Sequence, residues 1–319
     1  MNHIPVLKNE ILEIFTCLTQ EKAAIFVDGT IGLGGHSLAI ASKLKSKSSK
    51  LKIVGIDKDT KALEIAQQKI NKDGFNDIFT LIHGDFKNIS QTLSENNIEK
   101  IDGALLDLGV SSMQLDERER GFSFNDLDQN LDMRMDQTQG KTAAEILNFY
   151  SEETLASILK EYGDERFARS IARNILIFRK NQNIKTVRDF VEIISRSIPG
   201  KAKATSKIHF ATRSFQAIRI EVNSELKDLD NAITNFVELL NPGGKLAIIS
   251  FHSLEDRIVK ETFKMLSGYC SCPPKMPCIC GREKIIEITT RKPIIASDEE
   301  ICLNPRSRSA KLRIAQKLT

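Results

Sequence analysis

A glycine-rich segment that joins an apolar run to a predicted helix constrains the fold of this chain most. The apolar run, residues 23–27, ends in Asp28, and four glycines follow within residues 29–35. Glycines let the backbone turn sharply and approach a ligand at the N-terminus of the next helix, expected over residues 36–44. A second apolar run ends at Asp57, where a carboxylate can accept hydrogen bonds from a ribose. The pattern predicts a nucleoside cofactor, and a turn that serves packing alone is the alternative.

Apolar runs and helical patterns alternate through the first third of the chain. Four apolar runs are expected to be strands: residues 23–27, 52–56, 79–82 and 101–108. Asp59 is placed to cap the helix after the second strand, because Leu63, Ala66 and Ile70 then follow at helical spacing. Near-continuous apolar strands interleaved with helices indicate a parallel sheet that is covered on both faces.

After Asp136 the pattern changes to helices alone. Helices are predicted over residues 142–149, 151–162, 165–179 and 187–198, with a capping box at Thr186. The apolar spacing from residue 215 to residue 240 then predicts one long amphipathic helix, which Asn241-Pro242-Gly243-Gly244 should end.

The last part of the chain returns to strands. A strand predicted over residues 245–251 precedes a helix that Ser253-Leu254-Glu255-Asp256 should cap, and two strands near 284–292 and 311–318 bring the total to seven. The sheet domain is therefore split in sequence around an all-helical insertion. The expected domains are residues 1–138 with 210–319, and residues 139–209.

Length and composition exclude several classes of protein. A chain of 319 residues suggests about two domains. No apolar run approaches the roughly 18 residues of a membrane span, and the N-terminus lacks the profile of a signal peptide. Six cysteines in so long a chain do not make a disulfide scaffold. We therefore expect a reduced, cytoplasmic protein with no membrane association.

The charges are distributed unevenly although the net charge is only +4. Residues 179–213 hold nine Lys and Arg against two acids, residues 301–319 hold five against none, and residues 102–136 hold nine acids against three Arg. Local basic patches on a nearly neutral protein suit a polyanion bound over a limited footprint. They also suit ordinary solvated faces. The helical insertion is therefore a candidate RNA-binding region.

The turn itself narrows the choice of cofactor. Gly32-Leu33-Gly34-Gly35 is not the G-x-G-x-x-G of dinucleotide sites. Asp28, just before the turn, would repel a pyrophosphate but attract the ammonium of S-adenosylmethionine. Phe86 follows the third strand, where its ring can cover an adenine or simply pack in the core. These features predict an α/β fold, a seven-stranded S-adenosylmethionine-dependent methyltransferase (Rossmann-like) sheet with a helical insert.

Longer motifs resemble those of a known family. The chain is similar to the bacterial small-subunit ribosomal RNA cytosine-N4 methyltransferases of the MraW type, from His3-Ile4-Pro5-Val6-Leu7 to Ser307-Arg308-Ser309-Ala310-Lys311-Leu312-Arg313. The matching motifs between these two are Asp28–Ser37, Leu106–Ser112 with Gln114–Asp116, Arg120–Phe124, Leu131–Asp136, Ala211–Ala217 and Ser250–Arg257.

The resemblance implies a function, a cofactor and a set of contacts. It implies a cytoplasmic enzyme that moves the methyl group of S-adenosylmethionine to the exocyclic N4 amine of one cytidine in the decoding region. The implied partner is the small ribosomal subunit or its rRNA, and both a monomer and a homodimer stay open. By matched position the cofactor contacts are Gly34, Gly35, His36, Asp57, Phe86, Asp107 and Gln114.

The chemistry requires an acceptor for the amine proton. A cytosine amine is a weak nucleophile, so a group near the sulfonium must accept hydrogen bonds from it. Asp107, at the end of the fourth strand, has the right chemistry, and Ser250 and His252 after the fifth strand are the other catalytic candidates. The usual amino-methyltransferase motif, Asp/Asn/Ser-Pro-Pro-aromatic, is replaced here by Asp107-Leu108-Gly109-Val110. Asp107 as a cofactor contact alone is therefore the alternative.

Three sets of residues are open to two interpretations each. Phe122 and Phe124 would stack on a flipped base or pack in the core. A set of basic side chains would contact phosphates or simply form solvated faces. These residues are Lys201, Lys203, Lys207, Arg213, Arg306, Arg308, Lys311 and Arg313. Four cysteines would either bind one zinc or remain free thiols, and free thiols are the favoured interpretation. These cysteines are Cys270, Cys272, Cys278 and Cys280.

Two other functions stay compatible with the sequence. One is a methyltransferase for another target, such as DNA or a protein side chain. The other is an RNA-binding assembly factor that uses the fold without turnover.

Overall fold

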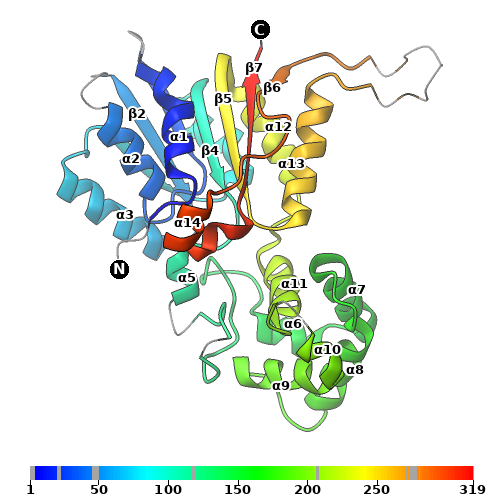
Figure 1. Ribbon diagram of the computed structural model, residues 1–319. Coiled ribbons are helices and arrows are strands. Elements are labelled where there is room, and N and C mark those ends of the chain that lie inside the picture. Colours follow the sequence, from blue (N-terminus) through cyan, green and yellow to red (C-terminus); the bar gives the residue numbers. More distant parts are fainter. Residues whose placement is uncertain are drawn as a thin grey trace. The chain divides into compact units, whose positions relative to one another are not determined.

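The computed structural model describes residues 4–19, 23–44, 50–116, 120–124, 126–205, 208–270, 272, 279 and 281–318. Two compact units make up the chain, Met1–Gly109 with Asp228–Thr319, and Val110–Lys227. Each unit has its own hydrophobic core, and each is described by itself (Figure 1). The predicted insertion, residues 139–209, lies inside the second unit.

The first unit is built on one seven-stranded sheet with the order β3-β2-β1-β4-β5-β7-β6. Strands β1 to β5 pair in parallel, and β7 runs antiparallel to β5 and β6. The strands are β1 Ala24–Asp28, β2 Leu51–Asp57, β3 Phe79–His83, β4 Ile101–Asp107, β5 Leu240–Ser250, β6 Ile286–Ile288 and β7 Lys311–Lys317. The seven-stranded sheet predicted from the sequence is confirmed.

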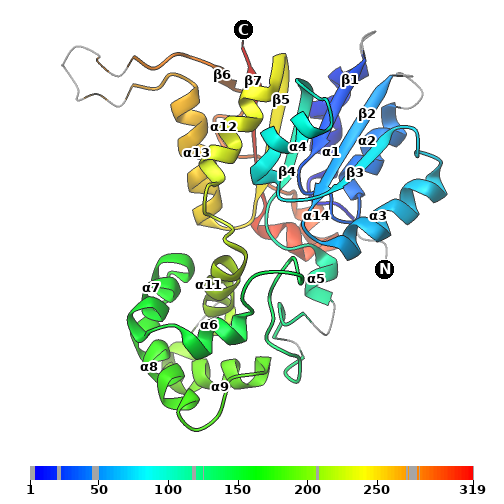
Figure 2. The ribbon, with the colours of Figure 1, turned by 180° about the vertical axis from the view of Figure 1, so that it is seen from behind.

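Helices cover both faces of this sheet (Figures 1 and 2). One core lies between the sheet and α1, α2 and α3, and the other between the sheet and α4, α12 and α13. The helices of this unit are α1 Lys8–Ile14, α2 Gly35–Leu44, α3 Thr60–Asp73, α4 Ile89–Glu95, α12 Leu229–Leu239, α13 Ser253–Leu266 and α14 Asp298–Leu303. The 3-10 turns are η1 Phe15–Thr19, η2 Phe86–Asn88 and η3 Pro305–Ser309.

Helix α3 begins where the sequence predicted. The Asp59 side chain accepts hydrogen bonds from the amides of Lys61 at 3.1 Å and Ala62 at 3.4 Å. A cap of this kind contributes about 1 kcal/mol to helix stability. Gly74, with φ 69°, ends the helix in the left-handed conformation that glycine adopts without strain. The cap fixes the start of α3 directly after Asp57, so that strand end is held in place.

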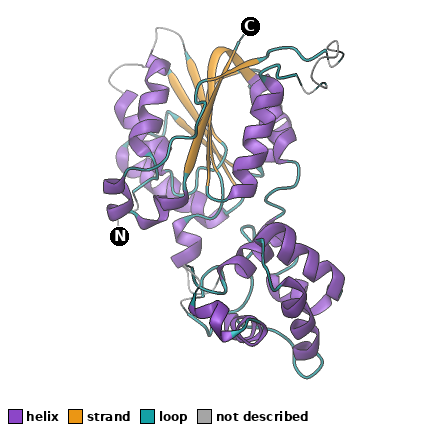
Figure 3. Ribbon diagram, turned by 45° about the vertical axis from the view of Figure 1, so that its right-hand side comes forward, coloured by secondary structure: helices purple, strands orange, loops and turns teal. Residues whose placement is uncertain are grey.

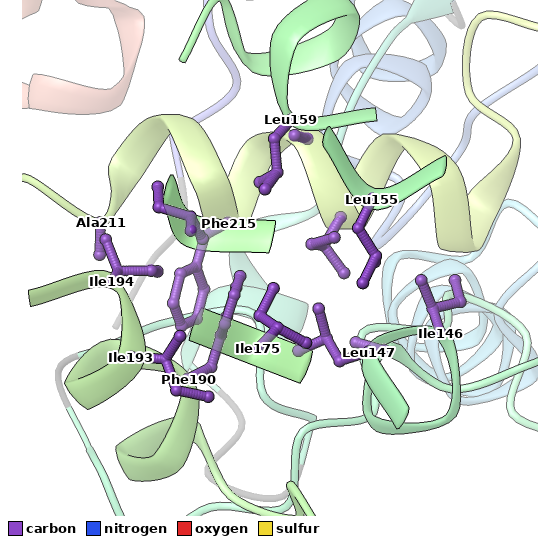
Figure 4. Packing of buried hydrophobic residues seen from close by; sticks show 14 of the residues in the cluster. Ile146, Leu147, Leu155, Leu159, Ile175, Phe190, Ile193, Ile194, Ala211 and Phe215 are labelled. Carbon is purple, nitrogen blue, oxygen red and sulfur yellow. The ribbon is translucent and has the colours of Figure 1, made fainter. Parts of the chain in front are cut away.

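The second unit is built from helices and loops, and the strands of Figure 3 belong to the first unit. Its helices are α5 Ser112–Asp116, α6 Ala143–Phe149, α7 Glu152–Gly163, α8 Ala168–Arg179, α9 Val187–Ser197, α10 Gly200–Ala204 and α11 Thr212–Asn223. Their apolar faces share one core, in which the rings of Phe190 and Phe215 lie 5.1 Å apart (Figure 4). The predicted capping box at Thr186 and Asp189 is present at the start of α9.

The long helix expected from residue 215 to residue 240 is wrong, because the chain forms two helices there. Helix α11 ends at Asn223 and α12 begins at Leu229, with Ser224 and Asp228 in the left-handed region at φ 50° and 57°. Helix α11 packs in the core of the helical unit and α12 packs on the sheet, so each has an apolar face of its own. The apolar spacing therefore continues across the break. Periodicity alone therefore cannot show where the chain passes from one unit to the other.

Strand β5 begins earlier than predicted, in the segment expected to follow the long helix. Ile101 of β4 pairs with Leu240, and Gly103 pairs with Lys245, so residues 241–244 form a bulge opposite Asp102. Gly243, at φ 84°, accommodates the bulge, and a bulge also tolerates Pro242, which has no amide proton. Strand β6, by contrast, is shorter than the predicted 284–292. None of the described helices has the length and apolarity that a membrane crossing requires.

Candidate functional site

Three aspartates end neighbouring parallel strands of the first unit. Asp28, Asp57 and Asp107 are the last residues of β1, β2 and β4, and β1 lies between β2 and β4. The chain winds outward from β1 to β3 and then returns to β4, on the other side of β1. Ligands of open α/β sheets bind at such a reversal, beyond the carboxyl ends of the strands.

Asp28 ties the end of β1 to the start of α2. Its carboxylate accepts hydrogen bonds from the Thr30 amide at 3.2 Å and the Ser37 hydroxyl at 2.5 Å. The side chain is 1% exposed. Burial raises the pKa of Asp28 to about 7, against the lowering effect of these two hydrogen bonds. Asp28 therefore shapes the turn and places a carboxyl group that a nearby cation would ionise.

The glycine-rich turn lies between these carboxylates. Asp57 accepts hydrogen bonds from the amides of Gly32 at 2.7 Å and Asp59 at 2.9 Å. Gly32 and Gly34 have φ values of 50° and 78°, which other residues adopt only with strain. From α3, the Lys69 ammonium donates to the Leu33 carbonyl at 3.1 Å. Contacts from Asp57 and from Lys69 thus hold the turn in place.

Asp57 retains hydrogen-bonding capacity beyond these contacts. Two carboxylate oxygens offer about four acceptor positions, and the two amides occupy one on each oxygen. Burial raises the pKa of Asp57 to about 6 although the same amides lower it. The remaining lone pairs suit a pair of ribose hydroxyls.

Asp107 is the least satisfied of the three aspartates. Its amide donates to the Thr30 hydroxyl at 2.6 Å, which fixes its backbone against the turn. Its Oδ2 lies 3.8 Å from His36 Nε2, while Oδ1 is buried with no hydrogen-bond partner among the described residues. Burial, and then the negative charges of Asp28 and Glu255, raise the pKa of Asp107 to about 8. Such an arrangement is expected where a ligand completes the site.

His36 and Phe86 lie close to the same turn. His36 is the second residue of α2 and is 6% exposed. Phe86 begins the 3-10 turn after β3, half-buried, and packs against the core on the α4 and α12 face. A side-chain carbon on Gly29 would lie 3.1 Å from Phe86 Cβ and 2.5 Å from Leu106 Cδ2. Gly29 therefore lets the turn pack directly on these neighbours.

His252 and Ser250 are engaged within the protein. His252, rather than the predicted Ser253, is the N-cap residue of α13, and its Nδ1 accepts from the Glu255 amide at 3.4 Å. Its Nε2 lies 3.1 Å from Glu255 Oε1, but this contact lacks hydrogen-bond geometry, and Nε2 is buried with no hydrogen-bond partner among the described residues. Ser250 is 2% exposed and its hydroxyl lies 3.4 Å from the Lys311 carbonyl. Both side chains thus hold the start of α13 and the edge of β7.

Gln114 and the two phenylalanines belong to the second unit. Gln114 Oε1 accepts from the Ser111 amide at 3.0 Å, within α5 and its start, so its role as a cofactor contact stays a prediction. Phe122 is 7% exposed in the helical core. Its packing interpretation is the one the structure supports. Phe124 is half-buried and stacks on His209, with ring centroids 4.4 Å apart.

Some of the predicted phosphate contacts are already paired. Asp256 receives the Lys311 ammonium at 3.1 Å and the Arg313 guanidinium at 2.7 Å. These bonds lower the pKa of Asp256 although burial opposes them. In the second unit, Lys203 donates to the Ser195 carbonyl at 2.9 Å. These three cations have partners within the protein, and their contact with phosphates stays a prediction.

Several predicted residues lie outside the described part of the chain. Cys278, Cys280 and Lys207 are among them, whereas Cys270 and Cys272 are described. The choice between zinc and free thiols therefore stays a hypothesis.

The residues at the strand ends fit S-adenosylmethionine. A buried acceptor without a partner, on Asp107, and a second carboxyl group, on Asp28, favour a cation. Asp57 offers acceptors for a ribose. Three residues of this arrangement were missed from the sequence: Thr30, Ser37 and Glu255. Thr30 and Ser37 belong to the same motif as Asp28 and the glycines, so hydroxyl side chains close in sequence to that acid were the available signal.

Comparison with known proteins identifies the family. The sequence model of the MraW methylase family matches residues 1–318. "Ribosomal RNA small subunit methyltransferase H" of Clostridium botulinum (strain Kyoto / Type A2) is 48% identical over 317 residues, which cover 99% of both chains. The protein of the same name from Geobacter sp. (strain M21) is 44% identical over 318 residues, again 99% of both chains.

Solved structures are more distant. A putative rRNA-methylase from Clostridium thermocellum is 12% identical, with a TM-score of 0.47 over 99% of this chain and 100% of that one. The full-length family match and the two relatives confirm the resemblance seen in the motifs, and they show that the chain belongs to the MraW methylase family.

Proposed function

We propose that this protein transfers the methyl group of S-adenosylmethionine to the exocyclic N4 amine of one cytidine in the decoding region of small-subunit ribosomal RNA. Membership of a methylase family supports the reaction type, and relatives named for small-subunit ribosomal RNA support the substrate. The observation that carries the proposal is the buried Asp107 Oδ1, which has no partner among the described residues. It lies at the end of β4, next to two further strand-end carboxyl groups.

The cofactor site is assigned to the turn after β1 and to the neighbouring strand ends. S-adenosylmethionine supplies a methyl group on a positively charged sulfonium. Asp57 would accept hydrogen bonds from the ribose hydroxyls, and Phe86 would cover the adenine. Gly34, Gly35 and His36 would line the turn, and Gln114 completes the set that the family motif implies.

Asp107 is assigned the role of proton acceptor. The lone pair of a cytosine amine is delocalised into the ring, so the nitrogen attacks only as its proton is withdrawn. In the protein alone, Asp107 has a pKa of about 8 and holds a proton at neutral pH. A cation within about 4–6 Å lowers the pKa of a carboxyl group by roughly 1–3 units. A sulfonium bound beside Asp107 would therefore favour the ionised carboxylate, which would then accept the amine proton.

His252 and Ser250 are assigned positioning roles. Both ring nitrogens of His252 have neighbours on α13, and Ser250 points its hydroxyl at the Lys311 carbonyl. With Nδ1 accepting from the Glu255 amide, the neutral ring carries its proton on Nε2, so His252 can take a second proton only on Nδ1 and with loss of that contact. Asp107 is therefore ranked ahead of them.

The proposal places the protein in the cytoplasm, with the small ribosomal subunit or its rRNA as partner. The exposed cations of the helical unit support a contact with RNA, since the phosphate backbone contributes a large share of most protein–nucleic acid affinities.

The experiment that tests this function follows a tritiated methyl group. The protein is incubated with labelled S-adenosylmethionine and, separately, with small ribosomal subunits, naked small-subunit rRNA, DNA and total protein. Digestion of the RNA to nucleosides should place the label in N4-methylcytidine and in no other nucleoside. Label in DNA or protein would identify a methylase of another target, and cofactor binding without any transfer would identify an assembly factor.

A further inference from the structure

A row of cations lies along one exposed face of α8. Arg169 and Arg173 lie one turn apart in the helix, Arg166 precedes it, and Lys180 follows it. Spacings of four and seven residues keep Arg169, Arg173 and Lys180, whose backbone is still helical, on one side, and Arg166 lies just before the helix. All four are exposed. From Arg169 to Lys180 this α8 cationic row extends over about 16 Å at 1.5 Å per residue.

The row lies opposite the buried side of the same helix. Ile171, Ala172 and Ile175 are fully buried in the core of the helical unit. Arg179 lies outside the row, because its guanidinium donates to the carbonyls of Leu147 at 2.9 Å and Tyr150 at 2.7 Å. The helix thus uses one arginine to hold the fold and leaves the row to solvent.

Acids that would neutralise the row are absent from α8. No Asp or Glu occurs between residues 166 and 180, and no cation of the row forms an ion pair with a described residue. The neighbouring helix behaves differently, since Arg188 pairs with Asp128 at 2.7 Å and Arg196 pairs with Glu192. Within one helical unit, α9 neutralises its exposed arginines and α8 does not.

One residue of the row, Arg169, lies where it is unfavourable for helix stability. Arg169 lies in the first turn of α8, where the partial positive charge of the helix disfavours a cation. By contrast, the first turns of α7 and α9 carry Glu152, Glu153 and Asp189. Nothing in the local structure of α8 therefore accounts for an arginine at this position.

We propose that the α8 cationic row binds the phosphate backbone of the RNA substrate, an inference that rests on the proposed function. Guanidinium groups bind phosphate oxygens in a bidentate manner, and a sequence-independent backbone contact needs only unpaired cations. An acidic protein partner fits less well, because Ile177 is the one large apolar side chain exposed on α8 and protein interfaces need apolar anchors. A membrane surface fits less well because the apolar face of α8 is already buried.

The test measures RNA binding as a function of salt. The double variant Arg169→Gln/Arg173→Gln is compared with wild type for binding to naked small-subunit rRNA by filter retention. Loss of two phosphate contacts should raise Kd by about tenfold or more near 0.1 M salt and reduce the slope of log K against log salt by about 1.4 to 1.8. Methyl transfer should then show a raised KM for RNA with kcat unchanged at saturation.

Two further proteins serve as controls. Lys43→Gln/Lys72→Gln removes the same charge from exposed positions on α2 and α3, and it should leave the salt slope unchanged. Arg169→Lys/Arg173→Lys keeps the charge and should recover most of the slope. Circular dichroism of each variant checks that the helices are retained.

The possible outcomes separate this proposal from the proposed function. If the Gln variant binds rRNA with the wild-type slope while methyl transfer to cytidine proceeds, the row has another role and the inference fails alone. If wild type transfers no methyl group to cytidine, the proposed function fails, and the binding measurement still decides whether the row contacts RNA. Unchanged affinity for rRNA with lost affinity for small subunits would mean that the row meets a ribosomal protein, which overturns the proposal.

Discussion

The two units differ in where they place charged groups that have no Lys, Arg, Asp or Glu partner within the described part of the chain. In the sheet unit, Asp28 and Asp107 are held at strand ends where burial raises their pKa values to about 7 and 8. In the helical unit, the cations of α8 are exposed, and no acid of the same segment neutralises them. Buried carboxyl groups favour a small cation that reaches into the structure, whereas a row of exposed guanidinium groups favours an extended polyanion.

This difference shows which side chains act in binding and which hold the fold. The chain has nearby partners for other charges, as in the contacts of Asp256 with Lys311 and Arg313. The strand-end carboxyl groups and the α8 cationic row have no such Lys, Arg, Asp or Glu partner among the described residues, and we explain these two sets by ligands. Variants of the sheet unit test whether its carboxyl groups bind the cofactor, and they follow in order of decreasing expected effect.

Replacement of the proposed proton acceptor should have the largest effect. Asp107→Asn should lower kcat by roughly 100-fold or more, the usual contribution of a positioned base. The Kd for S-adenosylmethionine should rise by no more than about tenfold, so single-turnover rates at saturating cofactor separate the two effects. Asp73→Asn, on the exposed end of α3, is the matched control. A large rise in Kd with an unchanged single-turnover rate would make Asp107 a cofactor contact only.

Removal of the ribose contact should weaken cofactor binding. Asp57→Ala should raise the Kd for S-adenosylmethionine by about tenfold or more, which corresponds to about 1.4 kcal/mol for a lost hydrogen-bonded contact. Calorimetric titration measures this directly. Asp57→Asn keeps an acceptor for the Gly32 amide and should show a smaller rise. Wild-type affinity in both variants would mean that the ribose lies elsewhere.

Burial of Asp28 should make the ligand-free protein less stable at high pH. Its folded-state pKa, about 7, lies above the ordinary value of 3.8, so the folded state binds more protons between these values and stability falls as pH rises through them. Asp28→Asn removes the titrating group and with it this loss of stability at high pH. Its melting temperature should exceed that of wild type by a few degrees at pH 8 and by little at pH 4. An equal difference at both pH values would show that Asp28 does not titrate in this range.

Loss of the α13 cap should have the smallest effect. His252→Ala removes the acceptor for the Glu255 amide, so the free energy of unfolding should fall by about 1 kcal/mol. Because the proposed role of His252 is structural, the turnover rate should fall by less than tenfold. Urea denaturation and steady-state kinetics measure the two quantities. If turnover instead fell as far as expected for Asp107→Asn while stability stayed unchanged, His252 would belong to the chemistry.

Much of this site was predictable from sequence because it is local. Asp28, Asp57 and Asp107 each end an apolar run, and parallel strands bring such ends to one edge. The Asp59 cap and the capping box at Thr186 were predictable for the same reason, since each depends on residues two or three positions away.

The features that sequence did not predict depend on distant partners. Arg313 and Asp256 are 57 residues apart, and Asp107 meets Thr30 across 77 residues. The break between α11 and α12 leaves the apolar spacing intact, because two separate cores accept the two helices. A pattern within one segment cannot distinguish these outcomes.

The most direct test of the central claim is a calorimetric titration of the protein with S-adenosylmethionine at pH 7 in two buffers of different ionisation enthalpy. Since a bound sulfonium should lower the pKa of Asp28 and Asp107, the account predicts tight binding with net release of protons to the buffer. S-adenosylhomocysteine, which lacks the sulfonium charge, should release fewer. No binding, or binding with equal proton release for both compounds, would contradict the assignment of the strand-end carboxyl groups to the cationic cofactor.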